Sequence, residues 1–465
     1  MTEIQHQARP NPARPPAVLG LIGNTPLIEL TRFDTGPCRL FAKLENQNPG
    51  GSIKDRIGLV MIEAAERAGK LRPGGLLVEA TAGNTGLGLA LAAAAKGYRL
   101  ILVIPDKMAI EKINHLKSLG ADIRVTRSDV GKGHPEYYQD MAERIAAEQG
   151  GFYVNQFANP ANPLAHETTT GPEIWEQMGR AVDAVVVGVG SGGTLTGLGR
   201  YFAHVSPGTK LVLADPKGSV LADMVETGAA GAAGSWVVEG IGEDFVPPNC
   251  DLSFVAAAYR IDDRESLVTA RDLLRLEGIL GGSSSGTLLA AALRFCRAQT
   301  EPKRVVTLVC DSGNKYLSKM YNDFWMEEQG FLPRRRTGDL RDIIGRPDDE
   351  GGTVSVGPDD SLLTAYKRMR VNEVSQLPVL ESGHLVGLLD ESDLLLRVVD
   401  EEHRFTDPVR SAMTAKVETV QCSAPIATLL DTFDRGYVAM VTDGDRFLGI
   451  ITRIDLLNHL RRRMK

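Results

Sequence analysis

The segment Ala184-Val185-Val186-Val187-Gly188-Val189-Gly190-Ser191-Gly192-Gly193-Thr194 joins a short apolar run to a glycine-rich turn. A continuous apolar run of this length is typical of a strand in a parallel sheet that is covered on both faces. Glycines between such a strand and a helix place several backbone N–H groups and the positive end of a helix dipole at one point. The segment therefore predicts an α/β fold with a phosphate-binding turn after this strand.

The same alternation of apolar runs and amphipathic stretches extends from about residue 18 to residue 330. Strands that alternate with helices form parallel sheets covered by helices, and ligands bind beyond the carboxyl ends of such strands. The glycine-rich segments of this chain fall at those ends. We predict strands at 76–80, 100–104, 184–187, 211–214 and 305–309, and helices at 57–68, 86–96, 110–119 and 267–276.

A dinucleotide-binding loop is the alternative interpretation of the first segment. Gly188, Gly190 and Gly193 occupy the glycine positions of a G-x-G-x-x-G fingerprint. An acidic residue that would bind the ribose is not evident at the usual distance, and the segment lies in the middle of the chain. The lysine of a P-loop is also missing. These features favour a phosphate site of another kind.

A second glycine turn, Asn48-Pro49-Gly50-Gly51-Ser52-Ile53-Lys54-Asp55-Arg56, contains a lysine. Ser52 can cap an apolar helix that is predicted to begin near Ile57. A lysine in this position is usually a surface charge, but burial or nearby cations lower the pKa of its ammonium group and make the amine a nucleophile. Lys54 is therefore a candidate to form an imine with the aldehyde of a cofactor.

A third segment, Thr81-Ala82-Gly83-Asn84-Thr85-Gly86, follows the predicted strand at 76–80 and opens a helix. Hydroxyl and N–H groups at a helix N-terminus suit a carboxylate. The segment can hold the α-carboxylate of an amino acid, although by itself it is an ordinary strand–turn–helix connection.

These three segments and Gly281-Gly282-Ser283-Ser284-Ser285-Gly286 occur in the order and approximate spacing of the fold-type II pyridoxal-phosphate enzymes. Over residues 18–332 the chain resembles the cystathionine β-synthase and cysteine synthase family. The resemblance implies two parallel-sheet α/β subdomains and pyridoxal 5'-phosphate as cofactor.

The resemblance also implies roles for individual residues. Lys54 forms the imine with the cofactor and moves the Cα proton, Asn84 binds the phenolic oxygen, and Ser284 faces the pyridine nitrogen. A neutral hydroxyl at that nitrogen favours elimination over transamination. The predicted phosphate ligands are Gly190, Ser191, Gly192, Gly193 and Thr194, and the predicted substrate contacts are Thr81, Ala82, Gly83, Thr85 and Gln156.

Two reactions are open within this family. One condenses L-serine with L-homocysteine to cystathionine and water, and hydrogen sulfide production can accompany it; the other joins O-acetylserine to sulfide. Segments that resemble the homocysteine-using enzymes favour the first: Met108 to Lys112, Asp215 to Ser219 and Val238 to Phe245. Features that resemble the cysteine synthases, or depart from both, are Phe157, the stretch Asn159 to Pro163 and Ala82.

The last part of the chain contains an internal repeat. Gln376-Leu377-Pro378-Val379-Leu380 with His384 to Leu395 is one copy, and Val438-Ala439-Met440-Val441-Thr442 with Arg446 to Leu457 is the other. Each copy predicts strand, turn, strand and a helix that opens at Ser, Thr or Asp. Two such units are expected to pair and bury their open faces.

The repeat resembles a pair of CBS domains, a regulatory module that often binds adenosyl ligands. By that resemblance Thr452 and Asp455 would hold ribose and phosphate of S-adenosylmethionine, AMP or ATP. Asp390 and Asp393 take these places in the first copy, and the extra carboxylate is unfavourable near a phosphate. A structural or dimerising role without ligand is the alternative. A different class of function, an adenosyl-ligand-sensing binding protein with an inactive first domain, is disfavoured by Lys54, Asn84 and Ser284.

These interpretations divide the chain into five parts. We predict a flexible tail (1–17), a catalytic domain (18–332), a linker (333–344) and two CBS domains (345–400 and 401–465). The linker carries Arg334-Arg335-Arg336, which is more typical of a solvated connection than of a nucleic-acid patch.

Composition limits the class of protein further. Hydrophobic residues make up 43% and charged residues 24% of the 465, and the net charge is −7, so nucleic acid is not expected as a partner. No apolar run is long enough for a membrane helix. Five scattered cysteines without C-x-x-C spacing suit a reducing cytoplasm and predict neither a metal site nor haem. The family resemblance implies a homodimer or dimer-built tetramer that acts on small amino acids.

Overall fold

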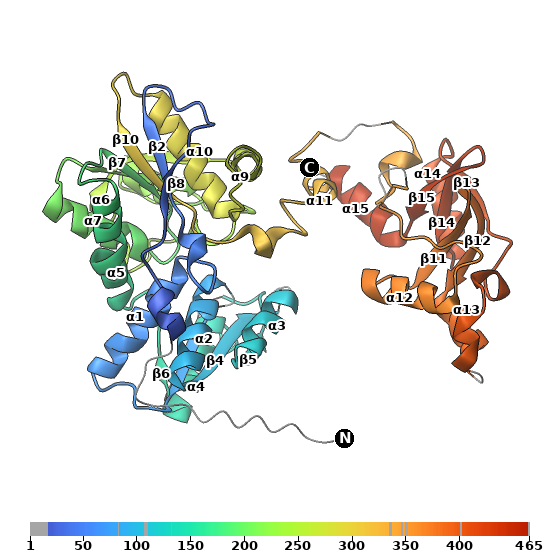
Figure 1. Cartoon of the computed structure of the whole chain (residues 1–465), viewed down its shortest axis with the longest axis horizontal. Coiled ribbons are helices and arrows are strands. Elements are labelled where there is room, and N and C mark those ends of the chain that lie inside the picture. Colours follow the sequence, from blue (N-terminus) through green and yellow to red (C-terminus); the bar gives the residue numbers. More distant parts are fainter. Residues whose placement is uncertain are drawn as a thin grey trace. The chain divides into compact units, whose positions relative to one another are not determined.

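The computed structural model describes residues 17–463 except 82, 107–109, 132, 334–336, 346, 349–351 and 400–401. Ala82, Met108, the three consecutive arginines and nearly all of the predicted tail lie outside the described residues. The chain divides into two compact units, one ending at Asn322 and the other beginning at Asp323 (Figure 1).

The first unit contains a six-stranded sheet whose neighbours are parallel except at one edge. Its middle strands are apolar at nearly every position, as the sequence predicts for a sheet covered on both faces. The strand order is β1 (Leu27–Glu29), β2 (Arg39–Lys43), β10 (Arg304–Leu308), β7 (Ala184–Val187), β8 (Lys210–Pro216) and β9 (Val255–Ile261). Its helices are α5 (Ala161–Ala165), α6 (Gly171–Gln177), α7 (Gly193–Val205), α8 (Leu221–Thr227), α9 (Asp263–Glu277) and α10 (Ser283–Arg297).

A second, four-stranded parallel sheet belongs to the same unit. Side chains of its two central strands alternate between two hydrophobic cores, so that α1 and α2 cover one face and α4 covers the other. The strand order is β5 (Asp122–Thr126), β4 (Arg99–Pro105), β3 (Leu76–Ala80) and β6 (Phe152–Tyr153). The helices are α1 (Lys54–Arg67), α2 (Asn84–Lys96), α3 (Ile110–Ser118) and α4 (Tyr138–Gln149). The predicted α/β class with two parallel-sheet subdomains is therefore confirmed.

The start of α1 corrects the prediction. The helix begins at Lys54 and not near Ile57, and the Ser52 hydroxyl accepts the Lys54 N–H at 3.2 Å. The apolar pattern did not reveal this first turn because Asp55 and Arg56 are polar residues that are buried.

Arg56 is buried inside a network of charges. Its guanidinium contacts Glu45 and Glu173 at 2.7 Å each, and Lys43 also contacts Glu173 at 2.7 Å. Desolvation raises the pKa of Glu173, but hydrogen bonds from Arg56 and Lys43 outweigh it and lower the pKa to about 2. The network joins α1 to β2 and α6, and thereby fixes the helix that carries Lys54.

The second unit holds a five-stranded sheet built from the two sequence repeats. The hairpin of each repeat is present, and β12 pairs with β15 through His384 and Arg446. Each repeat has its own hydrophobic core. The strand order is β11 (Gln376–Glu381), β12 (His384–Asp390), β15 (Arg446–Ile451), β14 (Ala439–Asp443) and β13 (Thr419–Gln421). The helices are α11 (Asp323–Glu328), α12 (Leu362–Asn372), α13 (Glu391–Val398), α14 (Ile426–Asp434) and α15 (Arg453–Arg463).

The predicted helix starts of the repeats carry capping side chains. Asp390 accepts the Asp393 N–H at 2.8 Å in a reciprocal capping box. In the second copy the Asp455 carboxylate accepts both the N–H and the hydroxyl of Thr452, at 2.8 and 2.6 Å.

Part of the predicted linker, residues 333–344, packs into the core of the second repeat. Leu340, Ile343 and Ile344 are each no more than 2% exposed. Among the described residues, no helix combines the length and apolarity needed to cross a membrane.

Candidate active site

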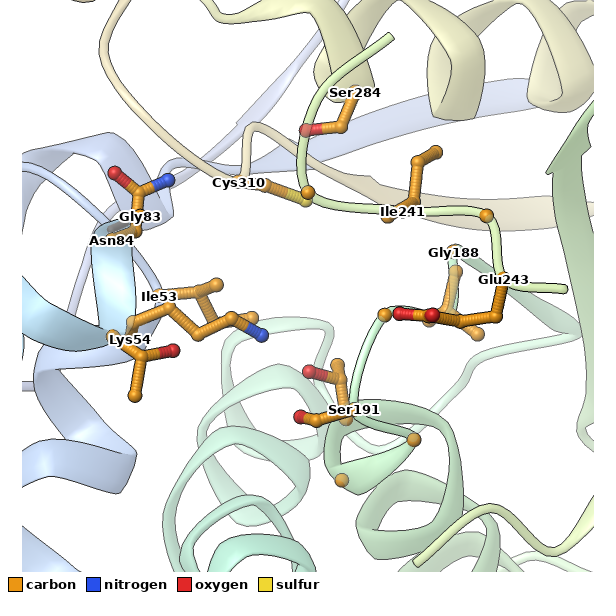
Figure 2. A pocket seen from close by; sticks show the side chains of 18 of the residues that line it. Ile53, Lys54, Gly83, Asn84, Gly188, Ser191, Ile241, Glu243, Ser284 and Cys310 are labelled. Atoms are coloured by element: carbon orange, nitrogen blue, oxygen red, sulfur yellow. The ribbon is translucent and has the colours of Figure 1, made fainter. Parts of the chain in front are cut away.

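A cavity of about 270 Å³ lies in the first unit where the carboxyl ends of strands from both sheets meet helix N-termini. Figure 2 shows side chains of its lining. All predicted cofactor and substrate residues that the structure describes line it, although they come from segments far apart in the sequence: Lys54, Thr81, Gly83, Asn84, Thr85, Gln156, Gly190, Ser191, Gly192, Gly193, Thr194 and Ser284. The roles given to them individually remain predictions.

Lys54 extends its amine into this cavity from the first turn of α1 (Figure 2). Within the described residues, the amine has no hydrogen-bond or ion-pair partner. Desolvation lowers its pKa, and the nearby Cys310, Asp311 and Glu243 only partly oppose this effect. A lysine whose pKa is lowered by burial is a better nucleophile, as imine formation requires.

The glycine-rich turn between β7 and α7 forms another wall. A Cβ on Gly190 would lie 2.5 Å from a backbone oxygen of the facing loop, and a Cβ on Gly193 would lie 1.9 Å from Asn162 Oδ1. Gly192 has φ +84°, and Asn162 donates to the Ser191 hydroxyl at 2.9 Å. The turn thus brings backbone N–H groups close to the cavity at the start of a 13-residue helix, which is the arrangement that binds phosphate.

A buried histidine supports the end of this turn. His166 Nε2 lies 3.3 Å from the Thr194 hydroxyl, and its Nδ1 lies 2.9 Å from the Thr170 hydroxyl. Desolvation lowers the pKa of His166 well below its ordinary value. The ring is therefore a neutral hydrogen-bonding support for Thr194 and adds no positive charge to the phosphate site.

Ser284 lies in the first turn of α10, beside Cys310 (Figure 2). Its hydroxyl lowers the pKa of the Cys310 thiol slightly, against the effect of burial. Desolvation raises the pKa of Cys310 to about 12, so the thiol is neutral. This wall of the cavity therefore presents neutral groups and no carboxylate, as expected for a site facing an unprotonated pyridine nitrogen.

Asn84, at the start of α2, is held by two charged residues. Its amide donates to Asp311 Oδ2 at 2.8 Å, and Lys315 Nζ donates to its oxygen at 2.5 Å. Tyr316 donates to the same Asp311 oxygen at 2.8 Å. The Asn84 amide keeps a second N–H, the group with which it would reach a phenolic oxygen.

The loop after β3 and the loop after β6 face each other across the cavity. Thr85 donates to Gln156 Oε1 at 2.6 Å, and the Thr81 hydroxyl accepts the Gly83 N–H at 3.3 Å. These contacts orient hydroxyl and amide groups at a helix N-terminus. They suit a substrate carboxylate.

Several residues of the site were not found from the sequence. Four of them form hydrogen bonds that hold predicted residues in place without lining the cavity: Asn162, His166, Asp311 and Tyr316. Two others, Glu243 and Cys310, line the cavity itself. Their only sequence signal was position: Glu243 lies in the noted Val238 to Phe245 segment, and Asn162 lies in the Asn159 to Pro163 stretch.

These residues fit pyridoxal phosphate. The cavity contains an amine without an anionic partner for an aldehyde, and a helix N-terminus whose glycines leave room for a phosphate. Asn162 also has a buried side-chain oxygen, Oδ1, without a hydrogen-bond partner in the described structure, beside the same turn. The donor set therefore matches both ends of the cofactor.

Comparison with known proteins places this site in a family. The pyridoxal-phosphate dependent enzyme family matches residues 18–311, and the CBS domain matches residues 349–400 and 409–462. Cystathionine β-synthase of Apis mellifera is 36% identical, over 96% of this chain and 90% of that protein. Cystathionine β-synthase of Saccharomyces cerevisiae is 33% identical, over 95% and 97%. The chain belongs to the cystathionine β-synthase family.

Two solved structures resemble the catalytic part of this family member. A hydrogen sulfide-producing enzyme from Fusobacterium nucleatum is 34% identical, with a TM-score of 0.60 over 64% of this chain and 99% of that one. O-ureido-L-serine synthase is 31% identical, with a TM-score of 0.62 over 69% and 97%. The predicted fold-type II catalytic domain and CBS-domain pair are thus confirmed.

The CBS-domain pair of this cystathionine β-synthase family member has a cavity of its own, of about 330 Å³. Thr452 and Asp455 line it, together with residues of the first repeat that include Thr353 and Gln376. Asp390 and Asp393, which take the equivalent places in the first copy, do not line it. The structure therefore places the predicted regulatory residues at a cavity between the two repeats.

Proposed function

We propose that the protein is a cystathionine β-synthase that condenses L-serine with L-homocysteine to cystathionine and water. The observation that carries this proposal is the position of Lys54, whose unpaired amine shares one cavity with the glycine-rich turn and Ser284. Such a constellation supports catalysis and disfavours a protein that only senses adenosyl ligands.

Each wall of the cavity has a task in this reaction. Gly190, Ser191, Gly192, Gly193 and Thr194 hold the cofactor's phosphate, Asn84 its phenolic oxygen and Ser284 its ring nitrogen. When bound, pyridoxal phosphate withdraws electrons from the Cα of the substrate. Lys54 takes the Cα proton and returns it, which its lowered pKa favours.

The substrate is held on the opposite side of the site. Thr81, Gly83, Thr85 and Gln156 receive the carboxylate of serine; Ala82 is proposed with them from the sequence alone. With the carboxylate held there, the Cα–H bond of serine faces Lys54, and the hydroxymethyl group faces away from the carboxylate-binding loops.

Cysteine synthase activity with O-acetylserine and sulfide is the second candidate. Phe157 favours it, because an aromatic ring without a hydroxyl group lines the cavity next to Gln156, 5.9 Å from the ring of Phe245. Apolar pockets discriminate weakly between thiols, by about 1–3 kcal/mol per methylene. Hydrogen sulfide release as a side reaction is therefore part of the proposal, and the likeness to a hydrogen sulfide-producing enzyme supports it.

The CBS-domain pair is proposed to bind one adenosyl ligand, S-adenosylmethionine, AMP or ATP, at Thr452 and Asp455. The cavity beside them supports this proposal. Five free cysteines suit a cytoplasmic enzyme, and a homodimer or dimer-built tetramer is the proposed assembly.

The decisive experiment compares substrate pairs on the purified holoenzyme. Serine with homocysteine is expected to give a higher kcat/KM than O-acetylserine with sulfide, with cystathionine identified by mass spectrometry. A strong preference for the second pair would overturn the assignment in favour of a cysteine synthase.

A further inference from the structure

One carboxyl group in the catalytic cavity has no task in the reaction described so far. Glu243 lines the cavity, and in Figure 2 its carboxyl group and the Lys54 amine point into it from opposite walls. Among the described residues this carboxyl group has no hydrogen-bond or ion-pair partner. Glu243 is only partly exposed to solvent, and a carboxyl group that is half-buried without a partner is uncommon in proteins.

The backbone that carries Glu243 is held firmly. The Ser219 hydroxyl accepts the Glu243 N–H and donates to its carbonyl oxygen, at 3.1 Å each. The preceding Gly242 donates to the Val189 carbonyl at 2.8 Å, which ties the segment to the glycine-rich turn. These bonds fix the backbone from which the carboxyl group extends into the site.

We propose that Glu243 is the general acid that protonates the departing hydroxyl group of L-serine. This inference rests on the proposed function, since it assigns the fate of the hydroxyl group in that reaction. Hydroxide is a poor leaving group, so its departure requires a proton donor at the oxygen. A positioned general acid accelerates such a step by about 10²–10⁴-fold.

The electrostatic surroundings of Glu243 favour its protonated carboxyl group, which can donate a proton. They disfavour the carboxylate, which would pair with the Lys54 ammonium group. Desolvation and the nearby Asp244 raise the pKa of Glu243, Lys54 opposes them, and the result is about 8. The phenols of Tyr137 and Tyr138 are the other titratable groups that interact with it electrostatically. Because the pKa lies above neutrality, most of the carboxyl population carries its proton at pH 7.

The protons and electrons balance over the two halves of the reaction. The Cα–H bond breaks and its proton moves to Lys54, while the Cα electron pair forms a double bond to Cβ. The Cβ–O bond breaks, its electron pair stays on oxygen, and Glu243 gives that oxygen a proton, so that water leaves. The incoming thiol then loses its proton to the Glu243 carboxylate as its sulfur bonds to Cβ, and Cα regains the proton from Lys54.

The test compares leaving groups in the Glu243→Gln holoenzyme, with homocysteine as the thiol. With L-serine, kcat/KM is expected to fall by about a hundredfold or more relative to the wild type. With β-chloro-L-alanine the fall in kcat/KM is expected to be much smaller, because chloride leaves without a proton and only the later thiol step still uses the carboxyl group. A serine loss no larger than the chloroalanine loss overturns the proposal. If the wild type itself does not condense serine with homocysteine, the proposed function fails instead, so the two failures are distinguishable.

Two further variants distinguish the loss of an acid from the loss of the folded structure. Glu243→Asp keeps a carboxyl group and is expected to recover part of the serine activity that Glu243→Gln loses; equal activity of the two variants would count against an acid role. Asp244→Asn removes the neighbouring exposed charge and is expected to keep the wild-type ratio of serine to chloroalanine activity when both are measured well below the pKa of Glu243. The loss of that negative charge lowers the pKa of Glu243, so the alkaline limb of the serine profile moves to lower pH.

Two measurements do not depend on turnover. Calorimetric binding of L-alanine, which is serine without its hydroxyl group, is expected to be equal in wild type and Glu243→Gln. Infrared difference spectra of the wild type are expected to show a protonated carboxyl band that titrates near pH 8 and is missing from Glu243→Gln. A wild-type spectrum without such a band would overturn the proposal.

Discussion

At the scale of single residues, the site depends on side chains whose protonation is set by burial. Lys54 loses its positive charge more readily than an exposed lysine because desolvation lowers its pKa, and the nearby Cys310, Asp311 and Glu243 only partly oppose this effect. Cys310 beside it stays a neutral thiol because desolvation raises its pKa to about 12. We therefore propose the lysine, and not the cysteine, as the nucleophilic group of the cavity.

Replacing Lys54 by alanine is expected to abolish both turnover and the visible absorption band of the lysine–cofactor imine. The physical reason is that no other amine lines the cavity among the described residues. Absorption spectroscopy after addition of pyridoxal phosphate checks this. Lys367→Ala, at an exposed position in α12, is the matched control and should keep the band. Surviving activity in Lys54→Ala would remove the residue from the mechanism.

Glu79 gives a prediction of pH-dependent stability. It is 1% exposed in β3, and desolvation raises its pKa from 4.5 to about 7. Because the folded pKa lies above the unfolded value, the contribution of its bound proton to stability is complete below pH 4.5 and is lost as the pH rises through 7.

The free energy of unfolding of the wild type should therefore fall relative to Glu79→Gln by about 3 kcal/mol between about pH 4 and pH 8. Urea unfolding at both pH values measures it. Glu148→Gln, whose side chain is 65% exposed, should show no such difference. Parallel pH profiles for wild type and Glu79→Gln would contradict the raised pKa.

At the scale of elements, the connection from β7 to α7 is the part of the fold most restricted in sequence. The strand and most of the first two turns of the helix are buried there, and the connecting turn has no room for side chains at several positions. Its geometry depends on Asn162, which comes from a different helix, α5. The phosphate site is therefore a property of two elements packed together and not of the loop alone.

Gly193→Ala is expected to weaken pyridoxal phosphate binding, because the new Cβ would lie 1.9 Å from Asn162 Oδ1. Overpacking costs about 1–3 kcal/mol, which corresponds to about a 5- to 150-fold rise in the dissociation constant. Titration of the apoenzyme with the cofactor, followed by absorption, measures this. Gly208→Ala meets nothing within 4 Å and should bind as the wild type does. Equal affinities of both variants would show that the turn adjusts freely.

At the scale of the whole molecule, catalysis and the proposed regulation occupy separate units. Every residue that lines the catalytic cavity precedes Asn322, and every residue that lines the second cavity follows Asp323. The hydrophobic cores are likewise contained within one unit or the other. Units with their own cores can fold independently.

A protein truncated after Asn322 is therefore expected to bind pyridoxal phosphate and to condense serine with homocysteine. Any effect of S-adenosylmethionine, AMP or ATP on the rate should be lost, because Thr452 and Asp455 are gone. Absorption spectra and rates with and without each ligand check this against the intact chain. A truncated protein that cannot bind the cofactor would show that the second unit is needed for the first to fold.

The sequence by itself determined the parallel α/β architecture, the repeat and most of the residues proposed to bind the cofactor. These features are local, because an apolar strand, a glycine turn and a helix start can each be recognised within about ten residues. The order of these motifs along the chain matches one family. Local patterns therefore predicted Lys54 and Gly190 to Thr194 as candidates, and the family resemblance that the order of the motifs implies added Asn84 and Ser284.

Only the tertiary structure decided which other polar groups reach the cavity and where α1 begins. No local pattern gave Glu243 or Cys310 a role, because their positions in the cavity depend on segments far away in the chain that burial brings together. Arg56 shows the same reason: a charged residue inside the first turn of a helix is stable only because distant Glu45 and Glu173 pair with it. Packing between distant segments, and not periodicity, sets the electrostatics of this site.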